Sequence, residues 1–154
     1  AVVAVMCLCE VAAWCKKNNK TLWDMMLEMY EKYGYYKEEL YTITMKGKEG
    51  SEQIAAIMEA LRANPPKEFA GWKVLEMRDY KSGKTVNPET GEEGETGLPT
   101  SNVLYFNLSD QAWCCARPSG TEPKIKFYMG VKGSSLEDAK NLVNELTEAL
   151  KSNL

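Results

Sequence analysis

The chain has 154 residues and a formal net charge of −3, with 44% hydrophobic and 27% charged residues. This composition is typical of a globular domain rather than a disordered segment, and the acidic balance argues against a general nucleic-acid surface. The sequence has no histidine, so it lacks the commonest general base and the commonest metal ligand. We therefore expect a binding function in which other residue types contact the ligand, with no nucleic-acid partner.

The sequence begins within a hydrophobic run, AVVAVMCLCEVAAWC, in which Glu10 is the only charged residue. This run is shorter than a membrane-spanning helix needs, and no basic segment precedes it as in a signal peptide. A helix that is apolar on nearly every side is typical of a protein core. We therefore expect no membrane partner, and we expect a chain cut from a longer protein whose other part covers this helix.

A second helix is predicted to begin after Thr21 and to end at Gly34. Thr21 can cap the helix, because Asp24 follows three residues later in a capping-box pattern. The next predicted elements are a strand at 41–45 and a helix that Ser51 caps, followed by another strand at 72–80. Residues 81–100 are rich in Gly, Pro, Thr and Glu, which indicates a long loop.

Two apolar runs at 101–108 and 112–116 predict a hairpin, and residues 124–131 alternate as a further strand. Ser135 and Asp138 form a second capping-box pattern, which predicts a last helix. This order indicates an α+β fold with a mostly antiparallel sheet, helices packed on one of its faces, and two preceding helices from an incomplete neighbouring domain. We place the boundary so that 1–36 precede a C-terminal domain at 37–154.

The chain has five cysteines, an odd number, without the CxxC spacing of a metal site. They lie in apolar helix and strand patterns, as is typical of buried, reduced thiols in a cytoplasmic protein. We therefore expect cytoplasmic localisation, free thiols and no metal site. The cysteines are Cys7, Cys9, Cys15, Cys114 and Cys115.

Residues 117–126, RPSGTEPKIK, combine three positive charges and two hydroxyls with a single carboxylate. Arg117 offers a planar set of donors that suits phosphate, and Ser119 and Thr121 add hydroxyl donors. Gly120 allows a ligand to approach the backbone closely and permits a positive φ. Lys124 and Lys126 share one face of the following strand. The segment predicts a phosphate-binding loop, although a plain turn between two strands would have a similar pattern.

The stretch RPSGTEPKIKFY at 117–128 resembles the signature of the C-terminal domain of the α-D-phosphohexomutases, the family of phosphoglucomutases and phosphomannomutases. The stretch LPTSNVL at 98–104 is similar to the phosphoglucomutase and phosphopentomutase branch. Residues 1–36 resemble the end of the third domain and its link to the fourth. The resemblance thus covers essentially the whole chain.

The resemblance implies that the parent enzyme interconverts sugar 1-phosphates and 6-phosphates through a sugar bisphosphate. A phosphoserine in the first domain and a Mg²⁺ loop in the second carry out that reaction, and neither signature is present here. The fourth domain holds the phosphate that is not reacting. By similarity, this grip comprises Arg117, Ser119, Gly120 and Thr121, with Lys126 assisting and Lys124 nearby. The implied partners are a phosphosugar and the upstream domains of the same polypeptide.

The family resemblance leaves the sugar open between glucose, mannose and a pentose, since the sugar-reading loop is not in this chain. Two other classes remain. A complete gene starting near residue 35 would favour an independent phosphate- or nucleotide-binding module. Self-association that is lost when 1–34 are deleted, without any phosphate binding, would favour an interaction module. We expect the chain alone to lack catalytic residues and mutase activity, and its apolar N-terminal helix to promote self-association.

Overall fold

The computed structural model describes residues 1–152, which form two compact units that divide between Tyr35 and Tyr36. The first unit contains α1 (Val2–Lys17) and α2 (Leu22–Tyr33). The capping box predicted for α2 is confirmed: the Asp24 N–H donates to the Thr21 hydroxyl at 3.1 Å, and the Thr21 N–H donates to the Asp24 carboxylate at 2.7 Å. These bonds satisfy two donors that the first turn of a helix leaves unpaired.

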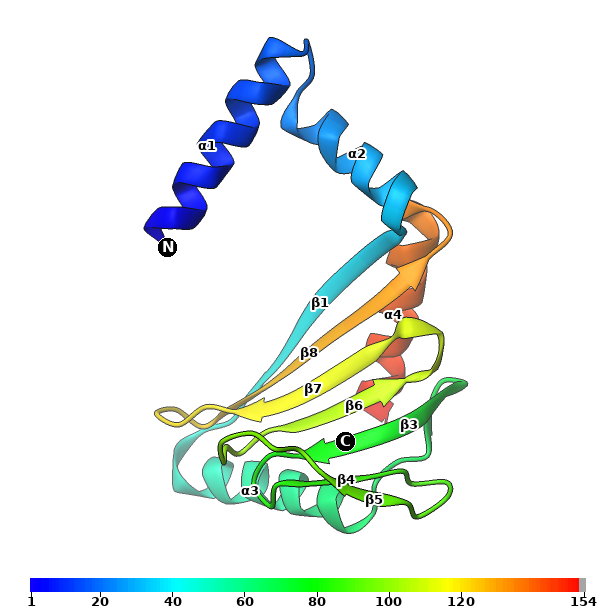
Figure 1. Ribbon diagram of the computed structural model, residues 1–154. Helices are drawn as coiled ribbons and strands as arrows, with labels where there is room; N and C mark the ends of the chain where they lie inside the picture. Colours follow the sequence, from blue (N-terminus) through cyan, green and yellow to red (C-terminus); the bar gives the residue numbers. More distant parts are fainter. Residues whose placement is uncertain (153–154) are drawn as a thin grey trace. The chain divides into compact units, whose positions relative to one another are not determined.

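The second unit is built on one sheet with the strand order β1-β8-β7-β6-β3-β4-β5, and β2 pairs with β3 beside this path (Figure 1). Every strand pair whose register is known is antiparallel. The strands are β1 (Tyr35–Thr44), β2 (Glu68–Phe69), β3 (Trp72–Asp79), β4 (Lys84–Val86), β5 (Glu93–Glu95), β6 (Leu104–Leu108), β7 (Trp113–Pro118) and β8 (Lys124–Gly133).

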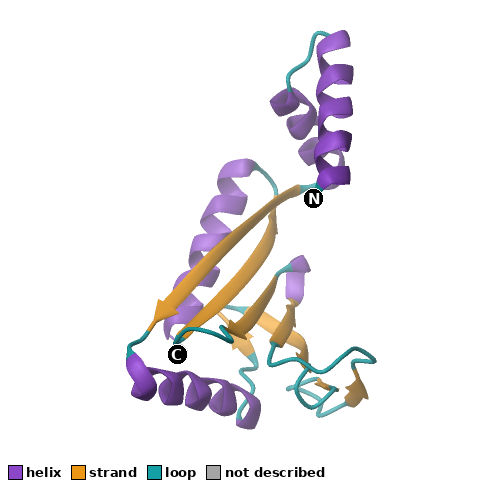
Figure 2. Cartoon of the chain, turned by 90° about the vertical axis from the view of Figure 1, so that its left-hand side faces the viewer, coloured by secondary structure: helices purple, strands orange, loops and turns teal. Residues whose placement is uncertain are grey.

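The helices of this unit are α3 (Gly47–Ala63) and α4 (Leu136–Ser152). Figure 2 shows these helices next to the strands of the sheet. Their buried residues and those of the strands form one core. β8 shows the pattern most clearly, because Ile125, Phe127 and Met129 are buried while the residues between them are only partly covered. The sheet therefore has one face packed against helices and one more polar face. The predicted α+β fold with two preceding helices is confirmed.

Three local predictions need correction. The helix predicted to begin at Ser51 begins at Gly47, and Lys46 occupies its N-cap position. Gly50 then lies in the first turn, where a side chain would clash, since an added Cβ would come within 2.6 Å of the Met45 Cβ. The first strand is longer than predicted, and the loop at 81–100 contains β4 and β5.

The imperfect alternation in β3 has a local cause. Its pairing with β6 shifts between Val74 and Glu76, which is the pattern of a β-bulge. The extra residue, Leu75, is exposed, and buried residues resume at Met77. After the bulge the inward-facing set includes Asp79, a carboxylate that must find partners inside the protein.

All five cysteines are free, but not all are buried. Cys7 and Cys9 are exposed, because the short first unit has too little surrounding chain to cover every side of α1. Cys15 is buried, with its Sγ 3.6 Å from the Met25 sulfur, and Cys114 lies in the sheet core. The prediction of uniformly buried thiols is therefore wrong, whereas the prediction of free thiols is confirmed.

These environments predict an order of reaction with a thiol reagent. Burial raises the pKa of the Cys114 thiol, and a neutral, covered thiol reacts slowly. We expect Cys7 and Cys9 to react first in the native protein, Cys115 later, and Cys15 and Cys114 only on unfolding. Timed alkylation followed by peptide mass analysis measures this order. Five reactive thiols should appear in unfolded protein without reductant, and fewer than four would contradict the assignment.

Within residues 1–152, none of the helices has both the length and the apolar composition of a membrane span.

Candidate phosphate-binding site

The predicted phosphate loop is the hairpin connection between β7 and β8, at one end of the sheet (Figure 1). The Ser119 N–H donates to the carbonyl oxygen of Lys124 at 2.8 Å, and the Lys124 N–H donates to the carbonyl oxygen of Glu122 at 2.7 Å. These two backbone bonds close the turn. The strands on either side hold the residues of the loop in a fixed register.

Arg117 and Lys126 lie directly opposite each other on neighbouring strands. Like charges in this position destabilise a sheet unless an anion lies between or above them. Neither side chain makes a hydrogen bond or ion pair with another residue of the described part of the chain. Arg117 is also exposed, so its guanidinium is available to a ligand. This pair is the strongest feature of the site.

The Ser119 hydroxyl organises the loop backbone. It accepts hydrogen bonds from the N–H groups of Thr121 and Glu122, at 3.4 and 3.3 Å. Both distances are at the long end of the hydrogen-bond range, so these bonds are weak. A phosphate oxygen with shorter bonds could replace them at little cost, while the Ser119 hydroxyl would become free to donate.

Gly120 differs in one respect from the prediction. It is not among the glycines with positive φ, so the turn does not require glycine for its backbone conformation. A Cβ added at Gly120 would meet no atom within 4 Å. Because packing within the chain does not demand glycine either, the open space beside it is consistent with close approach of a ligand to the backbone.

The two lysines of the segment are not equivalent. The Lys124 ammonium pairs with the Glu122 carboxylate at 3.0 Å, whereas Lys126 lies beside Arg117 without such a partner. A phosphate that bound Lys124 would have to compete with Glu122. Lys126 is therefore more available than Lys124 to bind a phosphate, because Lys124 already has Glu122 as its counter-ion.

A cavity of about 140 Å³ lies next to the loop. Ser119 and Lys124 line it, whereas Arg117 and Lys126 do not. The structure thus does not bring all the predicted residues together around this cavity. Asn102, which lies within the stretch at 98–104, also lines the cavity, although the sequence did not predict it there. The full lining is Ser51, Ile54, Ala55, Asn102, Pro118, Ser119, Glu122, Pro123 and Lys124.

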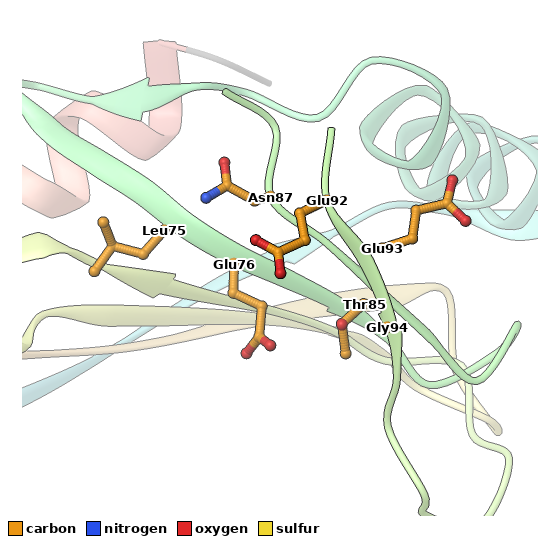
Figure 3. Close-up of a pocket in the computed structure, with 7 residues that line it drawn as sticks. All are labelled: Leu75, Glu76, Thr85, Asn87, Glu92, Glu93 and Gly94. Atoms are coloured by element: carbon orange, nitrogen blue, oxygen red, sulfur yellow. The ribbon is translucent and has the colours of Figure 1, made fainter. Parts of the chain in front are cut away.

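A second hollow lies over β3, β4 and β5, and Figure 3 shows the side chains around it. Three of its residues are glutamates, which would repel a phosphate: Glu76, Glu92 and Glu93. Glu76 pairs with Arg78, and Glu93 lies 3.7 Å from Lys84. No group of three or more His, Cys, Asp or Glu among residues 1–152 could hold a metal ion. The described residues therefore do not fit the Mg²⁺ that the family resemblance implies.

No strong nucleophile lies beside Arg117. Cys115 is two residues away, and burial raises the pKa of its thiol while the positive charge of Arg117 opposes that effect. The result is a neutral thiol at physiological pH. The arrangement can bind an anion, but its residues do not form a nucleophile–base pair.

The sequence of the chain is similar to that of known phosphoglucomutases. No family model matches the chain. Phosphoglucomutase from Staphylococcus aureus (strain bovine RF122 / ET3-1) is 34% identical over 146 residues, which are 95% of this chain and 26% of that protein. Phosphoglucomutase from strain N315 is 33% identical over the same length. The open form of pp63/parafusin, a phosphoglucomutase from Paramecium, aligns over 97% of this chain and 27% of its own, with 13% identity and a TM-score of 0.49.

The sequence similarity confirms the resemblance noted in the sequence: nearly the whole chain is similar to one part of phosphoglucomutase. The curated relatives named here are phosphoglucomutases. The chain spans about a quarter of the length of the curated relatives it matches.

Proposed function

We propose that this chain is the C-terminal, phosphate-holding part of a phosphosugar mutase that interconverts hexose 1-phosphates and 6-phosphates. The observation that carries the proposal is the pair Arg117–Lys126, two cations placed opposite each other without a counter-ion in the described structure. Homology to part of phosphoglucomutase supports the reaction class. Glucose is the preferred sugar in this proposal, and mannose or a pentose is the alternative.

Each residue of the loop has a role in this proposal. Arg117 binds two phosphate oxygens with its planar donors, and Lys126 adds a second charge. Ser119 and Thr121 donate through their hydroxyls, and Gly120 lets the phosphate approach the backbone. Lys124 contributes to phosphate binding when its ammonium group leaves the ion pair with Glu122. Holding the distal phosphate fixes the reacting end of the sugar, which is a positioning contribution to catalysis.

The transferred phosphoryl group and Mg²⁺ would come from other parts of a complete mutase, where Mg²⁺ stabilises negative charge on the phosphate. In this proposal the chain alone has no mutase activity, and the protein is cytoplasmic. Residues 1–36 would then be the end of the preceding domain, and 37–154 the C-terminal domain. Exposed apolar residues of α1, including Val2, Val5 and Leu8, support a covering partner for α1, and in its absence self-association.

Titration with inorganic phosphate tests the proposed site. The backbone amide NMR signals of Ser119, Gly120 and Thr121 should shift together and saturate with one dissociation constant. This constant should rise with salt concentration because the binding is electrostatic. Amide signals near Glu92 and Glu93 should not move. The absence of saturable shifts in the loop at tens of millimolar phosphate would refute the proposal.

A further inference from the structure

Backbone hydrogen bonds hold the residues on both sides of Asn102. The Ser101 N–H donates to the carbonyl oxygen of Tyr80 at 3.0 Å, and the Tyr80 N–H donates to the carbonyl oxygen of Val103 at 3.1 Å. Tyr80 directly follows β3, a central strand of the sheet. The short segment around Asn102 is therefore attached to the core of the second unit and is not a free loop.

The side chain of Asn102 is oriented by Arg62. The Arg62 Nη2 donates to the Asn102 Oδ1 at 2.6 Å. A guanidinium has donors only, so the atom that faces it must be the amide oxygen. The amide nitrogen of Asn102 is then the remaining polar atom, and it makes no hydrogen bond to any residue in 1–152. Asn102 lines the same cavity as Ser119 and Lys124.

Arg62 is itself firmly held. Its Nε donates to the Asp79 carboxylate at 3.1 Å, and its Nη1 donates to Glu59 at 3.0 Å. Its side chain is only 12% exposed. Each of the three guanidinium nitrogens donates to a different acceptor, so the group has little freedom to rotate. It therefore keeps the Asn102 amide in one orientation before any ligand arrives.

We propose that Asn102 is a further phosphate-binding residue and that Arg62 is the residue that positions it. The amide nitrogen of Asn102 donates to a phosphate oxygen held beside Ser119. This rests on the function proposed above, because the ligand is the same phosphate group. Ser119 and Asn102 line the same cavity, so a phosphate held there has both side chains within reach.

Asn102→Asp tests the proposal in the 154-residue chain, with inorganic phosphate as the probe. The aspartate keeps an oxygen for Arg62 but replaces the donor with a negative charge. We expect the dissociation constant of phosphate to rise at least tenfold. Asn87→Asp is the matched control, because it adds the same charge in the β4–β5 turn, where the Asn87 Oδ1 accepts from the N–H groups of Glu89 and Thr90. It should change the constant less than twofold.

Arg62→Lys tests the positioning role. A lysine keeps the charge but cannot hold Asp79, Glu59 and Asn102 at once. If Arg62 acts through Asn102, Arg62→Lys weakens phosphate binding in the parent chain but has little further effect in the Asn102→Asp background. An equal effect in both backgrounds would overturn the positioning role.

The NMR signal of the Asn102 side-chain NH₂ group distinguishes a failure of the Asn102 proposal from a failure of the proposed phosphate-binding loop. It should shift and saturate together with the loop amides. Saturating shifts at Ser119 and Thr121 with none at Asn102 would overturn the role of Asn102 and leave the phosphate loop intact. No shift anywhere in the parent chain would overturn both.

Discussion

Replacing Arg117 by alanine should lower kcat/KM about 10²- to 10³-fold in a complete mutase polypeptide that carries this chain. Arg117 is exposed, has no counter-ion among residues 1–152, and can make charge-assisted bonds to phosphate. Removing one partner of such a pair costs about 2–5 kcal/mol. This corresponds to roughly 30- to 4,000-fold in affinity. Steady-state kinetics with glucose 1-phosphate measures the effect.

Two variants sharpen this test. Arg117→Lys should recover only part of the loss, because lysine restores the charge without the planar set of donors. Lys140→Ala, which removes one exposed charge from α4, should leave kcat/KM nearly unchanged. The thermal midpoint of Arg117→Ala should stay close to that of the parent. A destabilised variant with normal activity per folded molecule would instead identify the loop as a structural turn.

Replacing Asp79 by alanine should lower the free energy of unfolding by about 3–5 kcal/mol, the range for breaking a buried ion pair. Asp79 is 7% exposed and accepts from Arg62 and from the N–H of Lys81. Its removal leaves the little-exposed Arg62 guanidinium without its buried partner. Urea unfolding measures the change. A loss below about 1 kcal/mol would show that water or other residues take over the role of Asp79.

The pH dependence of the free energy of unfolding gives an independent test of the contribution of Asp79. Burial alone would raise the pKa of the Asp79 carboxyl, but bonds from Ser82, the Lys81 N–H and Arg62 outweigh it and hold the pKa below its ordinary value of 3.8. A lowered folded-state pKa adds stability above the unfolded pKa, and this stability is lost as the pH falls through the folded value. Asp79→Asn should therefore flatten the acid side of the stability curve below about pH 5.

The sequence predicts those parts of the fold that have strong local signals. The capping box at Thr21 and Asp24 satisfies backbone donors within one turn, so four residues are enough to place the start of α2. The alternation in β8 reports burial residue by residue. A long and specific motif likewise located the loop at 117–126. None of these signals depends on contacts with distant parts of the chain.

The sequence does not predict what depends on distant contacts. Gly50 lies inside α3 because a side chain there would strike Met45, and helix propensity alone would not place glycine in that turn. β4 and β5 are short and polar. β4 forms by pairing with β3, whose outward-facing pattern is interrupted by a bulge, and β5 pairs with β4. The role proposed for Asn102 depends on Arg62, 40 positions earlier, which orients its amide.

A crystal structure with glucose 1-phosphate, compared with one containing glucose 6-phosphate, tests the central claim most directly. The proposed grip predicts that the phosphate occupies the same place in both complexes. An oxygen should lie about 2.7–2.9 Å from the Arg117 guanidinium, and others within reach of Ser119 and Lys126. The sugar should differ in orientation while the phosphate does not. A phosphate bound elsewhere at full occupancy, with Arg117 still unpaired, would contradict the account.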